Sequence, residues 1–284
     1  MVLPGFLVIL IFHYFPIYGI LIAFKDYSVA EGIMGSQWVG LKYFKMFLTS
    51  PMAGRLFKNT FLLGLYSLLW GFPAPIILAL LLNEIKNDAF KRTVQSISYI
   101  PHFISVVVIV GMLFEFAAVD GVFNKIVALF GKEAIPMMAY PQYFRTLYIA
   151  SNIWQGIGWG TIIYLAALTK VDPTLYDVAS IDGANRWQKV VHITWPTIKP
   201  TTTILLIFYM GGILGSNYQK ILLMYNDRTR IVADVIGTYV YRLGIQGAQF
   251  EYTTAIGLFM SVISFVLLYI ANLISRNVSE TSLW

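Results

Sequence analysis

The sequence contains no cysteine and carries little charge, and both shortages narrow the range of functions. Without cysteine, the chain has no disulfide, no thiolate nucleophile and no cysteine-ligated metal site. Charged residues make up only 12% of the 284 residues, whereas 58% are hydrophobic; soluble domains are about 25% charged. This balance indicates a chain with a lipid bilayer as its solvent. The formal net charge of +6 is spread without a basic patch, so nucleic acid is not an expected partner.

The sequence also lacks a recognisable catalytic, metal or nucleotide site. His13, His102 and His192 are scattered and do not have the spacing of metal ligands. No serine, histidine and acid form a nucleophilic set that the sequence reveals. The phosphate-binding pattern G-x-x-x-x-G-K-[ST] does not occur. We therefore expect no catalytic residue, no metal and no cofactor in this chain.

Six apolar segments are each long enough to cross the hydrocarbon core, which takes about 20 helical residues. They cover about residues 2–24, 60–82, 97–116, 146–169, 200–222 and 252–275. No linker rich in glycine, serine or proline divides them, so we expect an all-α membrane protein with a single transmembrane domain, residues 1–284. The first segment has no basic leader and no cleavage site of small residues, which favours a retained helix over a signal peptide.

The orientation of these spans does not follow from charge. An even number of spans puts both termini on one side of the membrane. Lysine and arginine are divided almost evenly between the two sets of loops, so the positive-inside rule leaves the side undecided.

The segment LYDVASIDGANRWQKVVHITWP, residues 175–196, is unusually polar for a connection between two spans. Asp172 and Pro173 predict a helix start, because aspartate caps a helix and proline suits its first position. Gly183 predicts a stop, and a second helix is expected from about Ala184 to Pro196. Two short amphipathic helices hinged at Gly183 would lie along the membrane surface. Such a unit either docks in a groove of a partner or rests on lipid headgroups.

This loop resembles the EAA loop of the permease subunits of binding-protein-dependent ABC importers. The residues that match the family's spacing are Asp177, Ala179, Gly183, Ile193 and Pro196. The sequence departs from the family at Asp177 in place of glutamate, at Val178 in place of alanine and at Trp195 in place of leucine. Residues 12–27, 92–108 and 158–177 resemble the subgroup that imports oligosaccharides and polysaccharides, which includes the larger permease of bacterial alginate importers.

The resemblance implies the fold and the partners of a type I ABC importer permease. The loop 172–196, between spans 4 and 5, would be a cytoplasmic coupling helix, and both termini would be cytoplasmic, in a bacterial inner membrane. The implied partners are a second, different permease, two copies of an ATP-binding subunit that hold ATP and Mg²⁺, a solute-binding protein and the carbohydrate, besides membrane lipid. The residues that would contact the ATPase are Tyr176, Asp177, Ala179, Asp182, Gly183, Ala184, Arg186, Trp187, Ile193 and Pro196.

Polar side chains within spans 4 and 5 are candidates for the substrate path, because polar groups in a bilayer usually face a cavity or another helix. These candidates are Asn152, Gln155, Trp159, Tyr209, Asn217, Tyr218, Gln219 and Lys220. Amides, hydroxyls and aromatic rings suit sugars, but the same residues also join helices and form interface belts. Lys220 has two interpretations: it extends to the headgroups, or it attracts an anionic sugar.

Two other classes of protein remain as alternatives. A self-sufficient secondary carrier driven by an ion gradient would need carboxylates near the middle of the membrane, and the central parts of the spans have none. An intramembrane enzyme would need a catalytic acid, histidine or metal set within the spans. Neither alternative accounts for the hinged polar loop.

Overall fold

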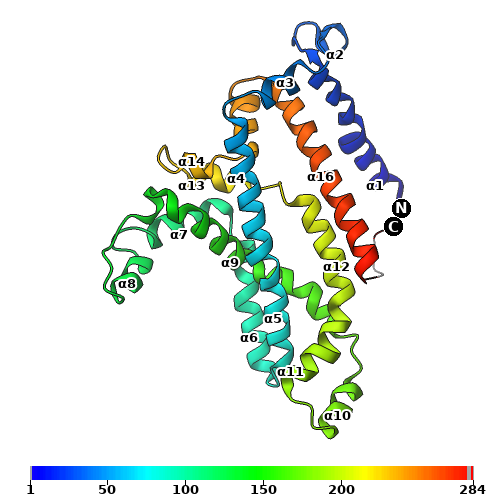
Figure 1. Cartoon of the computed structure of the whole chain (residues 1–284), viewed down its shortest axis with the longest axis vertical. Coiled ribbons are helices and arrows are strands. Elements are labelled where there is room, and N and C mark those ends of the chain that lie inside the picture. The colour runs from blue at the N-terminus through cyan, green and yellow to red at the C-terminus, as the bar shows by residue number, and fades with distance from the viewer. Residues whose placement is uncertain (1, 280–282, 284) are drawn as a thin grey trace.

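The computed structural model describes residues 2–279 and 283, and most of them are helical. In Figure 1 the molecule is elongated. One end holds a small ribbon in which β1 (Lys25–Asp26) pairs antiparallel with β2 (Gln37–Trp38), next to α2 (Gly32–Gly35) and α3 (Lys42–Leu48). The opposite end holds the loop that contains α10 (Pro173–Ile181) and α11 (Arg186–Lys189). The polar loop 172–196 therefore lies at one end of the long axis of the molecule.

Three helical runs are long and apolar enough to cross a membrane, and they confirm three of the predicted spans as helices. The first is Val2–Phe24, and it is almost entirely exposed in this chain. The second is Ala53–Glu84, and the third lies within α16 (Phe250–Ser279). The first two runs consist of α1 (Val2–Ile9), η1 (Leu10–Tyr14) and η2 (Phe15–Phe24), and of α4 (Ala53–Tyr66), η3 (Ser67–Gly71) and α5 (Pro73–Glu84).

The predicted span at 97–116 is not one straight helix but a bent pair of helices. The chain forms α6 (Asp88–Tyr99), a 3₁₀ turn η4 (Ile100–Phe103) and α7 (Val106–Phe116), and the two halves are bent by 104°. Pro101 lacks the N–H that would continue the α6 ladder, and Ile104 is extended. Ser105 then caps a new helix by accepting a hydrogen bond from the Val108 N–H at 3.4 Å.

The predicted span at 200–222 is also interrupted. Helix α12 (Trp195–Gly212) ends before α13 (Tyr218–Met224) begins. The break follows Gly212, and Asn217 starts the new helix by accepting a hydrogen bond from the Lys220 N–H at 3.1 Å. By contrast, the predicted span at 146–169 lies entirely within one long helix, α9 (Pro141–Leu168).

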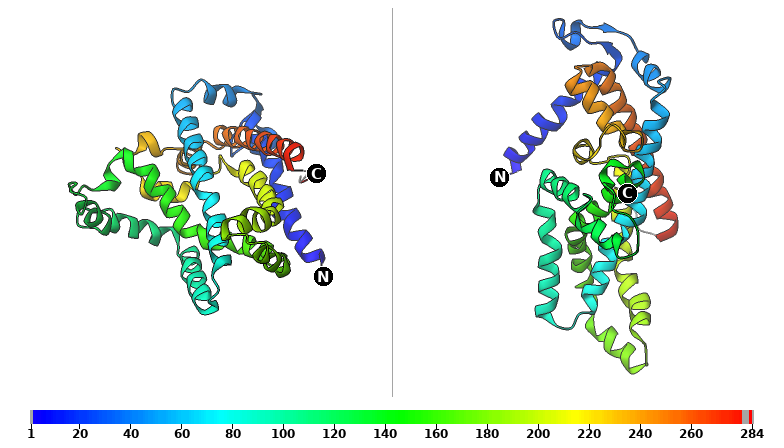
Figure 2. Two further views of the ribbon diagram at one scale, coloured as in Figure 1. Left: turned by 60° about the horizontal axis from the view of Figure 1, so that its bottom comes forward. Right: turned by 90° about the vertical axis from the view of Figure 1, so that its left-hand side faces the viewer.

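The remaining short helices and turns lie mainly towards the end that carries the ribbon. They are α8 (Val122–Ala128), η5 (Met137–Ala139), α14 (Arg230–Ala233), α15 (Ile236–Val240) and η7 (Tyr241–Gln246). The two views of Figure 2 show α1 diverging from the other helices, while α9 passes through the middle of the molecule.

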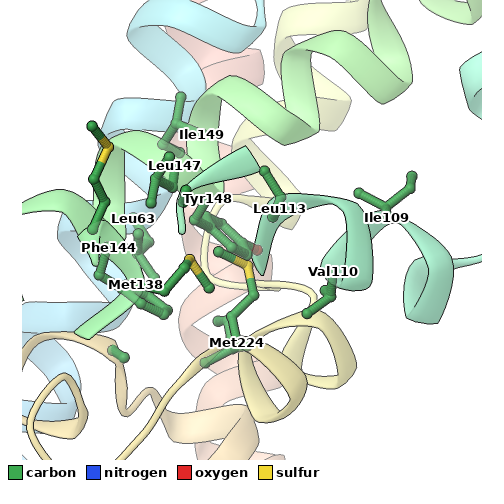
Figure 3. Close-up of a cluster of buried hydrophobic side chains, with 14 of the residues drawn as sticks. Leu63, Ile109, Val110, Leu113, Met138, Phe144, Leu147, Tyr148, Ile149 and Met224 are labelled. Carbon is green, nitrogen blue, oxygen red and sulfur yellow. The ribbon is translucent and has the colours of Figure 1, made fainter. Parts of the chain in front are cut away.

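Helix α9 is central because it contributes to two of the three apolar cores. One core joins it to α7 and α13 through side chains such as Leu113, Tyr148 and Met224 (Figure 3). A second core joins it to α5 and α12 through Ala79, Leu168 and Ile198. The third core packs α3 and α4 against α16. A movement of α12 or α5 would therefore reach α9 directly.

Candidate coupling loop and central cavity

The polar loop begins and ends its first helix where the sequence predicts. The Asp172 carboxylate accepts a hydrogen bond from the Thr174 N–H at 2.9 Å, and this bond holds the pKa of the Asp172 carboxyl below its usual value. Helix α10 ends at Ile181, and Gly183 follows with φ of +78°. Only glycine adopts this left-handed conformation without a steric cost, so the predicted hinge at Gly183 is confirmed.

The second helix differs from the prediction at both ends. It begins at Arg186, because Asn185 and Gln188 form reciprocal capping bonds of 2.9 and 2.7 Å. It does not end at Pro196. A π-helical turn, η6 (Val190–Thr194), connects α11 directly to α12. In this turn the Trp195 N–H bonds to the Val190 carbonyl, and this wider register accommodates the missing N–H of Pro196.

The loop is attached firmly to the helices behind it. The Tyr176 hydroxyl lies 2.9 Å from the Thr194 hydroxyl and so links α10 to η6. Tyr176 and Ile193 also pack against the apolar core between α5, α9 and α12. A second link joins α10 to α11, because Lys189 Nζ donates to Ser180 Oγ at 2.6 Å. These contacts make the loop an extension of α12.

The outer surface of the loop carries large apolar side chains that nothing in the described chain covers. Ile181 is 86% exposed and Trp187 is 73% exposed, with Leu175 and Val178 about half exposed. Asp177 and Arg186 are also exposed. Between the two helices lies a hollow of about 320 Å³. It is lined by Ala179, Asp182, Gly183, Ala184, Gln188, Lys189, His192 and Ile193.

A larger cavity of about 570 Å³ lies in the middle of the chain, where α9 meets the two halves of the Ala53–Glu84 run and the end of α12. Four of the predicted substrate-path residues line it. These are Asn152 and Gln155 on α9, Tyr209 on α12 and Asn217 in the break before α13. Their amide and hydroxyl groups give the wall both hydrogen-bond donors and hydrogen-bond acceptors.

The contacts of these lining residues fix parts of the wall. Gln155 Nε2 donates to the Ile104 carbonyl at 3.2 Å, which ties α9 to the bend between α6 and α7. The Asn217 N–H donates to the Tyr148 hydroxyl at 3.1 Å. Both breaks in the predicted spans are thus held by polar side chains of α9.

The other four candidates do not line this cavity. The indole of Trp159 stacks on His102, with ring centroids 4.5 Å apart, and only His102 belongs to the wall. Tyr218 packs against Tyr241, with ring centroids 5.6 Å apart, and Gln219 is exposed. Lys220 lies behind the wall.

Lys220 is fully buried within the protein, so the interpretation that it extends to the headgroups is wrong. Its Nζ donates to Asn152 Oδ1 at 2.7 Å and lies 5.9 Å from the centroid of the Tyr148 ring. The reason is the break after Gly212, which starts a new helix that packs against α7 and adjoins α9.

Sequence reasoning missed several lining residues, chiefly Tyr148, His102 and Ser67. Tyr148 and Ser67 had no local pattern to distinguish them from packing residues. His102 lies within the segment 92–108 that carries the family resemblance, but its neighbourhood is created by the bend after it. Only the folded arrangement brings these three residues together.

Comparisons with known proteins agree with this architecture. Residues 71–280 match the family described as "Binding-protein-dependent transport system inner membrane component". The chain is 43% identical over 285 residues to Protein LplB of Bacillus subtilis (strain 168), covering 100% of this chain and 90% of that protein. It is 44% identical over 285 residues to the polygalacturonan/rhamnogalacturonan transport system permease protein YteP of the same strain, covering 100% and 89%.

A solved structure gives the same answer for the fold. It is the crystal structure of a bacterial alginate ABC transporter in complex with an alginate pentasaccharide-bound periplasmic protein. One of its chains matches with a TM-score of 0.91 and 40% identity, covering 100% of this chain and 95% of that one. The chain therefore belongs to the family of binding-protein-dependent transport system inner membrane components, the integral membrane permeases of ABC transporters.

Proposed function

We propose that this chain forms part of the translocation path of a bacterial ATP-driven importer for an oligosaccharide or polysaccharide. The observation that carries the proposal is the central cavity, whose wall combines amides, hydroxyls and the ring of Tyr209. Sugars are bound by such hydrogen-bonding groups together with aromatic faces. The names of related permeases, which include transporters of polygalacturonan and alginate, support a carbohydrate cargo.

Six membrane crossings in a single domain, residues 1–284, are part of this proposal. The bent pair α6 and α7 would be the third crossing, and α12 together with the break before α13 would be the fifth. Helix α9 would be the fourth, beside the cavity. Irregular backbone at membrane depth is tolerated where it lines a cavity, and the break before Asn217 does line one.

The loop 172–196 would be the coupling helix that seats in a groove of a separate ATP-binding subunit. Its exposed Ile181 and Trp187 are the kind of apolar anchors that fill a pocket on a partner. ATP and Mg²⁺ would be bound by two copies of that subunit and not by this chain. When the two copies close on ATP, α10 would move with them and shift α12 and α9, which changes the relative populations of two transporter conformations.

The remaining partners follow from the same proposal. A solute-binding protein would deliver the carbohydrate, and a second, different permease would complete the path. The exposed apolar run Val2–Phe24 leaves a large surface for that permease and for lipid. The complex would lie in the inner membrane, with both termini and the loop 172–196 on the cytoplasmic side.

Uptake by the reconstituted complex tests this proposal against the alternative of a secondary carrier. Proteoliposomes with the permease pair, the ATP-binding subunit and the solute-binding protein should accumulate the labelled oligosaccharide only when ATP is on the side of the ATP-binding subunit. Uptake driven by a proton or sodium gradient without ATP would overturn the proposal.

A further inference from the structure

Lys220 places a positive charge directly behind the wall of the central cavity. Its side chain is fully buried, and its Nζ donates to Asn152 Oδ1 at 2.7 Å. The same Nζ lies 5.9 Å from the centroid of the Tyr148 ring. Asn152 and Tyr148 both line the cavity, as does Asn217 at the start of the same helix. The ammonium is therefore separated from the cavity by single side chains.

No carboxylate neutralises this charge in the part of the chain that the structure describes. The ion pairs among those residues involve only the carboxylates of Asp26 and Asp234. The residues that line the cavity include no aspartate and no glutamate. A neutral amide and an aromatic face compensate a buried cation only in part. The positive potential of Lys220 is therefore directed into a cavity that has no negative charge of its own.

Burying an ammonium without a counter-ion costs free energy, and the chain could have avoided this cost by leaving the side chain of Lys220 in contact with water. A lysine at the end of a span normally extends its long side chain to water. The break before α13 instead turns Lys220 inward, against α9. Ionisable groups buried within membrane segments usually mark a substrate or ion pathway.

We propose that Lys220 supplies the positive potential by which this cavity favours acidic carbohydrate, that is, an oligosaccharide of uronic acid units. The inference rests on the proposed function as a carbohydrate importer. A carboxylate in the cavity is attracted by the uncompensated ammonium, and the attraction is stronger than in bulk water because protein side chains lie between Lys220 and the cavity. A neutral sugar gains nothing from the same charge. Lys220 acts through Asn152, because it donates to the amide oxygen and so orients the side chain of Asn152 in the cavity wall.

Two substitutions remove the potential in opposite ways. Lys220→Met deletes the charge together with its hydrogen bond. Asn152→Asp keeps the hydrogen bond and places a carboxylate against the ammonium, so that the pair becomes neutral while the contact becomes stronger. Lys220→Arg retains the charge. If Lys220 only stabilises the fold, Lys220→Met should impair the importer and Asn152→Asp should not. If Lys220 acts through its charge, both variants should show the same loss of selectivity for acidic sugars. Lys125→Met removes a positive charge from an exposed lysine of α8 that does not line the cavity, and it is the matched control.

The measurement is ATP-dependent uptake into proteoliposomes that contain the complete importer with its solute-binding protein. The probes are tetramers of galacturonate and of mannuronate, each compared with its fully methyl-esterified, neutral form. Selectivity is the ratio of acid uptake to ester uptake. Any preference of the solute-binding protein is the same for every variant and cancels in the comparison with wild type.

Wild type should favour at least one of the two acids over its ester. That ratio should fall about tenfold in Lys220→Met and in Asn152→Asp, and stay near the wild-type value in Lys220→Arg and Lys125→Met. The inference is overturned if Asn152→Asp and Lys220→Met keep the wild-type ratio, or if wild type takes up the esters as readily as the acids. Failure of wild type to take up any of the four probes with ATP would overturn the proposed function, and this inference with it.

Discussion

The hydroxyls of Tyr176 and Thr194 lie 2.9 Å apart and connect the first helix of the polar loop to the helix that becomes α12. Tyr176 belongs to α10, whereas Thr194 is the last residue of the π-helical turn η6, and its side chain is buried. Because η6 and α12 are continuous, this contact connects the exposed loop to a helix that reaches the cavity. In the proposed mechanism, a displacement of α10 would thereby be passed to Tyr209, which lies on α12 and lines the cavity.

The Tyr176→Phe variant tests this route. It removes one hydrogen bond, worth about 0.5–1.5 kcal/mol, and keeps the packing of the ring against Ile193 and the core behind it. We expect transport per ATP hydrolysed to fall about two- to tenfold, because α10 can then move without α12. Uptake and ATP hydrolysis are measured in the same proteoliposomes. Thr194→Val should cause the same loss, and the double variant should add nothing further; additive losses would show that the two hydroxyls act separately.

A large side chain at Gly183 should disrupt docking without disturbing the fold of the loop. A Cβ at Gly183 would meet no atom within 4 Å, so the clash with Gly183→Trp would come from the partner. The φ of +78° adds a backbone cost of about 1–2 kcal/mol. Gly131 is the matched control, because it has φ of +72°, equally open surroundings and a position outside the loop. We expect Gly183→Trp to abolish coupled uptake and Gly131→Trp to retain it. Equal losses of uptake in the two variants would show that the effect comes from backbone strain and not from docking.

Reversal of the charge at Asp177 should uncouple transport from ATP hydrolysis. Asp177 is exposed on α10 and forms no hydrogen bond or ion pair within the described chain, so its substitution leaves the fold intact. We expect Asp177→Lys to reduce co-purification of the ATP-binding subunit and to reduce uptake at least tenfold. The reason is that a lysine would repel a basic group of the partner that pairs with Asp177. Asp227→Lys, at an exposed aspartate outside the loop 172–196, is the control. Normal uptake by Asp177→Lys would argue that this acid makes no contact with the ATPase.

The buried ion pair between Asp234 and Arg242 should stabilise the fold and not the coupling. Arg242 donates to both carboxylate oxygens of Asp234, at 2.8 and 2.7 Å, and Asp234 is fully buried. Asp234→Asn leaves the guanidinium without its counter-ion, which costs about 3–5 kcal/mol. We expect a clear drop in the thermal unfolding temperature in detergent. The double variant Asp234→Leu with Arg242→Met should recover much of the loss, because the remaining cation near Asp234, Arg230, is 39% exposed and stays in contact with water; an equally unstable double variant would contradict this account.

The local features of the polar loop were predictable from sequence because caps and hinges act over a few residues. Asp172, Pro173 and Gly183 each impose a backbone preference of their own, and the structure has a helix start and a helix stop at those positions. The end of the second helix was predicted wrongly at Pro196. The π-helical turn that accommodates this proline depends on packing against α5 and α9, which a local pattern does not contain.

The breaks within two predicted spans, and the cavity between them, depend on contacts between distant residues. Pro101 was visible in the sequence, but a long apolar run around it favoured a straight span. The burial of Lys220 depends on Asn152, which lies on another helix. Asn152, Gln155, Tyr209 and Asn217 were identified by their polarity alone, and their common cavity appears only when α9, α12 and the break before α13 are brought together.

The most direct test of the central claim is cross-linking from the exposed tip of the polar loop. The chain has no cysteine, so Ile181→Cys introduces a single reactive thiol on a side chain that is 86% exposed. Leu129→Cys, at a residue that is 83% exposed and follows α8, is the control. In the assembled, ATP-hydrolysing complex, a short thiol-reactive cross-linker should join Ile181→Cys, and not Leu129→Cys, to the ATP-binding subunit. Labelling of Ile181→Cys by an impermeant reagent from the extracytoplasmic side, with no cross-link to that subunit, would contradict the account.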